Sequence, residues 1–172
     1  MNAAAELARP HLRQHEPMAR HTSWRVGGPA DVYFEPNDLP ELQAFLAGLP
    51  AGTPLLWVGL GSNLLVRDGG FRGAVVCLGK GFAGIAALDE RTLTAGAAVP
   101  CAKLAQQLGR AGLAGGEFLA GIPGTVGGAL AMNAGAHGGE TWQRVRAVQT
   151  IDRAGNVHRR TPADYRIAYR SV

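Results

Sequence analysis

The chain has 172 residues, enough for one ordinary domain or two small ones, and its 47% of hydrophobic and 17% of charged residues predict a globular core. The first ten residues lack the apolar run of a secretory signal, and the two cysteines lack CxxC spacing, so we expect reduced thiols in a cytoplasmic protein. The net charge of +4 excludes neither an anionic small molecule nor nucleic acid as a partner.

The first half of the chain is expected to contain three strands and one helix. Residues 1–19 are polar and contain two prolines, which predicts an irregular leader. A helix is expected after Asn37 or Asp38, because either residue offers an N-cap and apolar residues follow at helical spacing. The expected strands cover residues 31–36, 54–58 and 73–78. We assign residues 20–82 to a first unit.

The second half is expected to contain a strand, a helix, a glycine-rich loop and a hairpin. Pro100 suits the first position of a helix, and Gly112 suits its end. The expected strands cover residues 91–95, 145–152 and 156–161, the last two joined by a tight turn. We assign residues 83–172 to a second unit, so the element order predicts an α+β protein with two units.

The C-terminal part is strongly basic. Residues 144–172 hold seven Arg against two Asp, whereas residues 1–143 hold ten Lys and Arg against eleven Asp and Glu. The arginines are dispersed and the aromatic residues among them are few, which disfavours nucleic-acid binding. A solvated basic face and a surface for an anionic small molecule both remain open.

A glycine-rich turn follows the expected strand over residues 54–58. Residues 59–63 read GLGSN, in which two glycines allow close backbone approach and Ser62 and Asn63 offer side-chain donors to phosphate oxygens. The turn is not a Rossmann fingerprint, because Leu64 stands where the third glycine belongs, and it lacks the Gly-Lys-Ser/Thr of a P-loop. Alone it is weak, since such turns often carry these residues for conformational reasons.

The most unusual stretch is residues 118–136, which contain five glycines and no charge. Most of it is not expected to form an ordinary helix, and we interpret it as a packed loop whose backbone faces a ligand. A membrane helix is disfavoured by Pro123, Asn133 and the glycine content. A flexible linker is disfavoured by the apolar residues in the stretch.

Together the two glycine-rich segments predict two backbone-lined walls. Such walls suit a large, flat, phosphate-bearing cofactor between two subdomains. No clustered set of His, Cys and carboxylate residues predicts a metal site. His137, a lone histidine among glycines, is more typical of a surface residue.

Five motifs, taken in order, resemble the N-terminal half of the UDP-N-acetylenolpyruvoylglucosamine reductases, flavoenzymes of peptidoglycan precursor synthesis. The resemblance runs from about Arg20 to the last residue, and the linked motifs make it far more specific than any one of them. They are HTSWRVGGPA at residues 21–30, GLGSNLLV at 59–66, GIPGTVGG at 121–128, NAGAHGG at 133–139 and YRS at 169–171.

The resemblance implies non-covalent FAD between two subdomains of the fold shared with vanillyl-alcohol-oxidase (PCMH) type flavoproteins. The FAD would be reduced by NADPH and would pass hydride to the enolpyruvyl double bond of a UDP-sugar substrate. The residues implied to contact FAD are Leu60, Gly61, Ser62, Asn63 and Leu64, then Gly121, Ile122, Pro123, Gly124, Thr125 and Gly128, and then Asn133, Gly135 and Ala136.

The resemblance also assigns a catalytic arginine. Arg170 matches the family's active-site arginine, which polarises the substrate carboxylate and stabilises the developing enolate, and Tyr169 would bind substrate beside it. A guanidinium suits that role because it offers fixed donors where negative charge accumulates. Ser171 belongs to the same motif and is not the family's proton-donating serine.

The chain departs from the family's pattern in two ways. The family's proton-donating serine, a second active-site glutamate and the substrate-binding third subdomain lie beyond Val172, so we expect an incomplete second subdomain and little turnover by this piece alone. His137 also stands where many relatives carry tyrosine.

We expect a monomer at full length, without membrane insertion. The alternatives are a non-catalytic FAD or nucleotide-binding module and another flavin oxidoreductase of the same superfamily.

Overall fold

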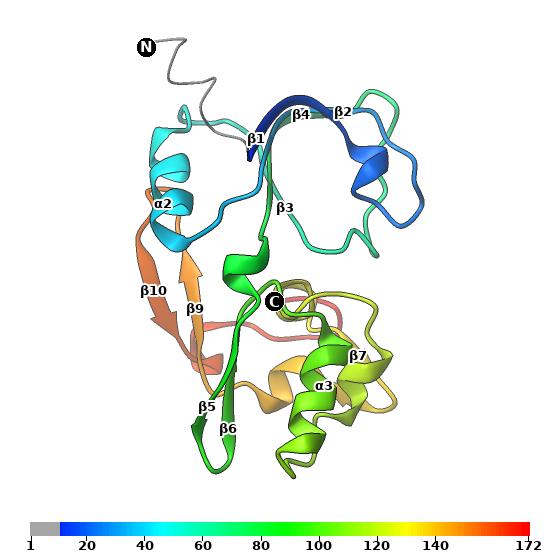
Figure 1. Cartoon of the computed structure of the whole chain (residues 1–172), viewed down its shortest axis with the longest axis vertical. Helices are drawn as coiled ribbons and strands as arrows, with labels where there is room; N and C mark the ends of the chain where they lie inside the picture. The colour runs from blue at the N-terminus through cyan, green and yellow to red at the C-terminus, as the bar shows by residue number, and fades with distance from the viewer. Residues whose placement is uncertain (1–10) are drawn as a thin grey trace.

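The N-terminal half forms a four-stranded sheet with one helix packed on it (Figure 1). The computed structural model describes residues 11–172. The sheet has the strand order β1-β2-β4-β3, in which β1 runs antiparallel to β2, and β4 runs parallel to both β2 and β3. The strands are β1 (Leu12–Pro17), β2 (Pro29–Phe34), β3 (Leu55–Val58) and β4 (Phe71–Cys77).

Alternating side chains of these strands build two cores, one on each face of the sheet. Tyr33 and Val75 belong to a cluster with Met18 and Val66, whereas the next residues along the same strands, Phe34 and Val76, belong to a second cluster. The period of two follows from the pleat, which points successive side chains to opposite faces. The helix α2 (Leu39–Gly48) covers the second cluster through Leu42, Phe45 and Leu46.

The sequence-based expectations for this half are largely confirmed. Asp38 caps α2, because its side chain accepts a hydrogen bond of 2.9 Å from the backbone N–H of Glu41. The expectation of an irregular leader is wrong for residues 12–17, which form β1. These residues are ordered by backbone pairing with β2, and their polar sequence gives no pattern from which a strand could be predicted. Residues 1–10 of that leader lie outside the described residues.

The C-terminal half is built from short pieces around a third core. Its helix α3 (Cys101–Arg110) packs on the 3-10 turn η3 (Glu117–Gly121), and together they bury Cys101, Phe118 and Leu119. Three two-stranded hairpins complete this half. They are β5 (Ile85–Asp89) with β6 (Thr92–Ala95), β7 (Gly135–Ala136) with β8 (Gly139–Glu140), and β9 (Val148–Ile151) with β10 (Val157–Arg160).

Two further findings add to the sequence analysis. Residues 85–89, which it did not assign to a strand, pair as β5 with β6. Val126–Ala131 forms a six-residue helix, α4, whereas the rest of the stretch 118–136 forms no α-helix, as expected for most of it. The helix forms because Thr125 provides an N-cap and its glycines pack closely: a side chain at Gly127 would meet Ala97 at 3.1 Å.

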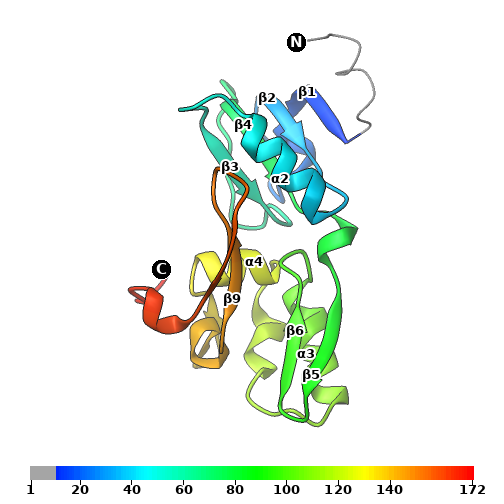
Figure 2. The same ribbon diagram turned by 90° about the vertical axis from the view of Figure 1, so that its left-hand side faces the viewer.

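The β9–β10 hairpin connects the two halves. Figure 2 shows it reaching from the C-terminal half to the side of α2. The side chain of Gln43 on α2 donates a 2.8 Å hydrogen bond to the carbonyl oxygen of Gly155 in the hairpin turn, and Ile151 packs against the second core cluster. The two halves therefore contact each other through this hairpin, in addition to the contact between the glycine-rich segments 59–63 and 121–125.

Candidate functional site

The turn after β3 presents a row of backbone donors. Gly61 has a left-handed backbone (φ +65°), and a side chain there would collide with the carbonyl of His21. None of the backbone N–H groups of Leu60, Gly61, Ser62 and Asn63 donates a hydrogen bond to an acceptor within residues 11–172. Consecutive N–H groups of this kind form a concave site for an anion.

The second wall, residues 121–125, uses part of its backbone donors internally. The N–H groups of Ile122 and Gly124 donate to the carbonyls of Leu119 and Ile122, at 3.1 and 2.9 Å. The side chain of Thr125 accepts a 3.4 Å hydrogen bond from the N–H of Gly128, which closes the first turn of α4. The N–H of Thr125 itself has no acceptor within residues 11–172, so this wall adds a backbone donor to those of the turn after β3.

The two walls face each other. A side chain at Gly59 would meet the hydroxyl oxygen of Thr125 at 2.5 Å, and a side chain at Gly124 would meet the Ser62 hydroxyl at 3.6 Å. Segments some 60 residues apart in sequence thus meet at Gly59 and Gly124, where each glycine lies against a hydroxyl side chain of the other segment. The structure brings together the two segments that the sequence analysis paired.

The third predicted segment folds as a hairpin beside the second wall. His137 and Gly138 both have positive φ, +49° and +82°, so they form the turn between β7 and β8 in the manner of a type I′ turn. A side chain at Gly121 would meet the His137 ring at 2.8 Å and the Ala136 methyl group at 2.9 Å. Gly135 and Ala136 therefore lie against the Gly121 end of that wall.

Asn133 is the buried centre of this region. Its side chain is 2% exposed and its backbone is left-handed, with φ +41°. The amide nitrogen donates to a Glu140 carboxylate oxygen at 2.9 Å and to the Ala168 carbonyl at 3.1 Å, while the amide oxygen accepts from the Trp142 N–H at 3.2 Å. The structure thus gives the Asn133 side chain an internal role, because its amide is engaged by protein groups.

Tyr169 and Arg170 occupy the tip of a tight turn. Ala168 and Ser171 exchange backbone hydrogen bonds of 3.0 and 3.2 Å, and Arg170 has φ +51°. Both tip residues are exposed, and the guanidinium carbon of Arg170 lies 5.7 Å from the centre of the Tyr169 ring. Within residues 11–172 the Asn133 side chain is the group that hydrogen-bonds this turn to the glycine-rich region.

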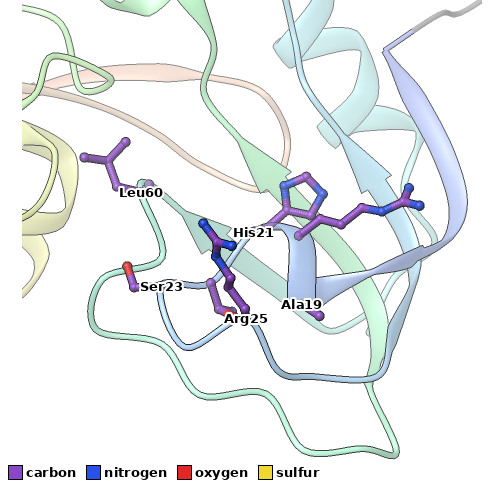
Figure 3. A pocket seen from close by; sticks show the side chains of 8 residues that line it. Ala19, His21, Ser23, Arg25 and Leu60 are labelled. Atoms are coloured by element: carbon purple, nitrogen blue, oxygen red, sulfur yellow. The ribbon is translucent and has the colours of Figure 1, made fainter.

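A cleft of about 780 Å³ opens beside the turn after β3 (Figure 3). Its lining combines Gly59 and Leu60 with the loop that precedes β2, including Arg20, His21 and Arg25. The sequence analysis gave no role to residues of this loop. Residues 21–30 are the first of the five family motifs, which could have marked the loop as functional, but the sequence does not show that it lies beside Gly59 and Leu60.

Neither cysteine has the properties of a reactive thiol. Burial raises the pKa of Cys77, and burial likewise raises the pKa of Cys101 to about 11. Over the described residues, no group of three or more His, Cys, Asp or Glu side chains is placed to hold a metal ion. In the same part of the chain, no helix has the length and apolar character needed to cross a bilayer.

Comparisons with known proteins agree with this geometry. Residues 30–161 match the family described as FAD binding domain. UDP-N-acetylenolpyruvoylglucosamine reductases from Nitrosomonas eutropha and Alkalilimnicola ehrlichii are 54% and 55% identical over 96% and 100% of this chain, but over only 51% and 58% of their own lengths. The solved structure of UDP-N-acetylenolpyruvylglucosamine reductase from Thermus caldophilus matches with a TM-score of 0.78 and 34% identity, over 93% of this chain and 56% of that one. The chain spans about half the length of the curated relatives it matches.

Proposed function

Because this chain belongs to the FAD binding domain family, we propose that it forms the flavin-binding part of a UDP-N-acetylenolpyruvoylglucosamine reductase. The observation that carries the proposal is the row of N–H groups over Leu60–Asn63, which have no acceptor within residues 11–172 and lie in a turn that meets the second wall at Gly124 and Thr125. The pyrophosphate of FAD matches such a site in charge and in its need for many donors.

The residues of the walls fit FAD differently. Leu60, Gly61, Ser62, Asn63 and Leu64 would hold the pyrophosphate, because their N–H groups and the Ser62 and Asn63 side chains are available as donors. The segments 121–125 and 135–136, with Gly128 behind them, would shape the space for the rest of the cofactor. Asn133 would act by holding the neighbouring backbone, since its own amide is fully engaged.

The chemistry that FAD supplies when bound is transfer of hydride from NADPH to the enolpyruvyl double bond. Within this chain, the guanidinium of Arg170 would bind the substrate carboxylate and stabilise the negative charge that accumulates during reduction. Tyr169 would line the same site. The amide of Asn133 would hold the turn that carries both residues through its hydrogen bond to Ala168.

The domain assignment belongs to the same proposal. We take residues 20–82 as a first FAD-binding subdomain and residues 83–172 as a second, incomplete one. The four-stranded sheet ends at Cys77 and the next hairpin begins at Ile85, which supports a boundary between them. A cytoplasmic location, a monomeric state and a UDP-sugar substrate remain proposals for the full-length protein.

A titration of the purified chain with FAD tests the proposal. We expect a shifted flavin absorption spectrum, quenched flavin fluorescence and a higher unfolding temperature, because a ligand that binds only the folded state adds about 2.7 kcal/mol of stability at a hundredfold excess over Kd. A longer gene product should then couple NADPH oxidation to consumption of the enolpyruvyl substrate.

Two outcomes would separate the proposal from its alternatives. FAD binding by the longer product without NADPH-dependent turnover would favour a non-catalytic binding module. Absence of FAD binding by both the folded 172-residue chain and the longer product would contradict the flavin assignment itself.

A further inference from the structure

The loop before β2 carries a cationic side chain, Arg25, to which the site described above gives no role. Arg25 is exposed, lines the cleft beside Gly59 and Leu60, and makes no hydrogen bond or ion pair through its side chain within residues 11–172 (Figure 3). The other basic side chains that line the cleft, Arg20 and His21, lie beside a carboxylate. The buried Glu16 carboxylate binds His21 at 2.9 Å and has Arg13 and Arg20 at 3.6 and 3.9 Å.

The backbone of this loop is held in a defined shape. The N–H of Arg25 donates to the Thr22 carbonyl at 3.1 Å, and the Thr22 hydroxyl donates to the Val26 carbonyl at 3.0 Å. Arg25 itself has φ +54°, a conformation that a residue with a long side chain keeps only where its surroundings impose it. The backbone position from which the Arg25 side chain extends is therefore set by the fold.

The loop is also joined to the turn that carries the backbone donors. The N–H of Ser23 donates to the Gly61 carbonyl at 3.1 Å, and the lack of a side chain at Gly61 permits the contact with His21. The carbonyl of Gly61 is thereby turned to the loop before β2. The cleft lining contains no Asp or Glu.

We propose that Arg25 is the counter-charge for the diphosphate group that the Leu60–Asn63 turn binds, so that the loop over residues 21–25 forms a third wall of the nucleotide site. The inference rests on the proposed FAD binding. Its physical basis is that the turn supplies only uncharged donors, whereas a diphosphate is an anion whose burial requires a compensating charge. Of the two arginines that line the cleft, Arg20 lies 3.9 Å from the Glu16 carboxylate, whereas Arg25 has no carboxylate partner in the described residues.

Affinities for FAD, ADP and riboflavin test the assignment, because the first two carry a diphosphate and riboflavin carries none. In Arg25→Gln, we expect Kd for FAD and for ADP to rise at least about tenfold, with the riboflavin affinity unchanged. The salt dependence of FAD binding should also become weaker. Arg110→Gln, which removes an equal charge at the exposed end of α3, is the matched control and should leave all three affinities unchanged.

A second variant separates the charge from the backbone conformation. Arg25→Gly accepts positive φ without strain and should show the same loss of FAD and ADP affinity even if Arg25→Gln folds poorly. An unchanged FAD affinity in Arg25→Gly, or an equal loss for riboflavin and FAD, would overturn the assignment while leaving FAD binding intact. A wild-type chain that binds ADP but not FAD would uphold the anion site against the flavin proposal. Failure of both the folded chain and the longer product to bind either ligand would overturn both.

Discussion

At the scale of single residues, the role of each residue at this site depends on its backbone conformation and on the atoms packed around it. Asn133 and Arg170 both adopt positive φ, yet only Asn133 is buried, with its amide bonded on every side. Gly61 and Gly124 differ in a similar way: Gly61 has a left-handed backbone and no room for a side chain against His21, whereas a Cβ at Gly124 would make an ordinary contact with Ser62. Residues that look equivalent in a motif therefore have different physical tasks.

Substitution of Asn133 should destabilise the fold. Asn133→Ala leaves the Trp142 N–H and the Ala168 carbonyl without their partner, and we expect the free energy of unfolding to fall by about 2–3 kcal/mol. Urea denaturation followed by tryptophan fluorescence measures the loss. Asn63→Ala, at an exposed position whose side chain makes no hydrogen bond within residues 11–172, is the control and should change stability by less than about 0.5 kcal/mol. Equal effects would contradict the internal role of Asn133.

The two wall glycines should separate stability from binding. Gly61→Ala places a methyl group against the His21 carbonyl at positive φ, so we expect the apo protein to lose at least about 1–2 kcal/mol of stability. Gly124→Val should leave apo stability nearly unchanged but weaken FAD binding, because its methyl groups fill the space next to Ser62. Chemical denaturation and FAD titration of both variants measure the two effects. Normal FAD affinity in Gly124→Val would show that this space is not used by the cofactor.

At the scale of elements, the short helix α4 and the short β7–β8 hairpin are stabilised by their caps, turns and neighbours, because neither is long enough to be stable alone. The six-residue α4 is too short to be stable as an isolated helix, and it begins at a capping threonine that also lies against Gly59. The β7–β8 hairpin pairs only two residues on each strand and is held by its turn and by packing on Gly121. The glycine-rich stretch therefore forms a compact structure because its neighbours hold it.

The cap of α4 can be tested by a pair of substitutions at one position. Thr125→Val removes the hydroxyl that accepts from Gly128 and should lower the free energy of unfolding by about 1 kcal/mol. Thr125→Ser keeps that hydroxyl and should retain most of the stability. Thermal unfolding followed by circular dichroism compares them. If the serine variant loses as much as the valine variant, the methyl packing of Thr125 matters more than the cap.

At the scale of the whole molecule, several contacts hold the halves together, and two of them join segments far apart in sequence. One is the meeting of the glycine-rich walls, and the other is the β9–β10 hairpin, which rests on α2 through Gly155 and places Ile151 in the N-terminal core (Figure 2). Within the hairpin, Asp152 accepts hydrogen bonds from the N–H groups of Ala154 and Asn156 and lies 2.8 Å from the His158 ring. The turn that reaches α2 is thus ordered around one carboxylate.

This carboxylate should make stability depend on pH. The His158 ring, followed by the Asn156 N–H, holds the pKa of Asp152 well below its ordinary value of 3.8. A depressed pKa contributes stability that is present above the ordinary value and is lost as the pH falls through the folded-state value. We therefore expect Asp152→Asn to be less stable than the wild type at pH 6, and the difference to shrink steadily below pH 3.8.

Urea denaturation between pH 7 and pH 3 measures this difference. Glu90→Gln is the control, because Glu90 is an exposed carboxylate whose side chain makes no contact with a cation or donor within residues 11–172. Its difference from the wild type should stay flat over the same range. A flat difference for Asp152→Asn as well would show that the hairpin does not depend on this carboxylate.

Local patterns in the sequence determined much of this protein. The cap at Asp38, the apolar strands, the stop at Gly112 and the hairpin over residues 148–160 follow from nearest-neighbour preferences, and the linked motifs identified the flavoprotein family before any contact was known. These features are legible because each depends on residues a few positions apart. The family's FAD and its fold class are confirmed by the comparisons, while the roles of single site residues stay predictions.

Tertiary structure alone decided the rest. Residues 12–17 are a strand because β2 offers them an edge, and α4 exists because Ala97 and Thr125 enclose its glycines. The hydrogen bond from Asn133 to Ala168 spans 35 positions, and Arg25 and Leu60 line one cleft although β2, α2 and β3 lie between them in sequence. Such contacts have no sequence signature, because the partner of a glycine, a carbonyl or an unpaired strand edge is fixed only when distant segments pack together.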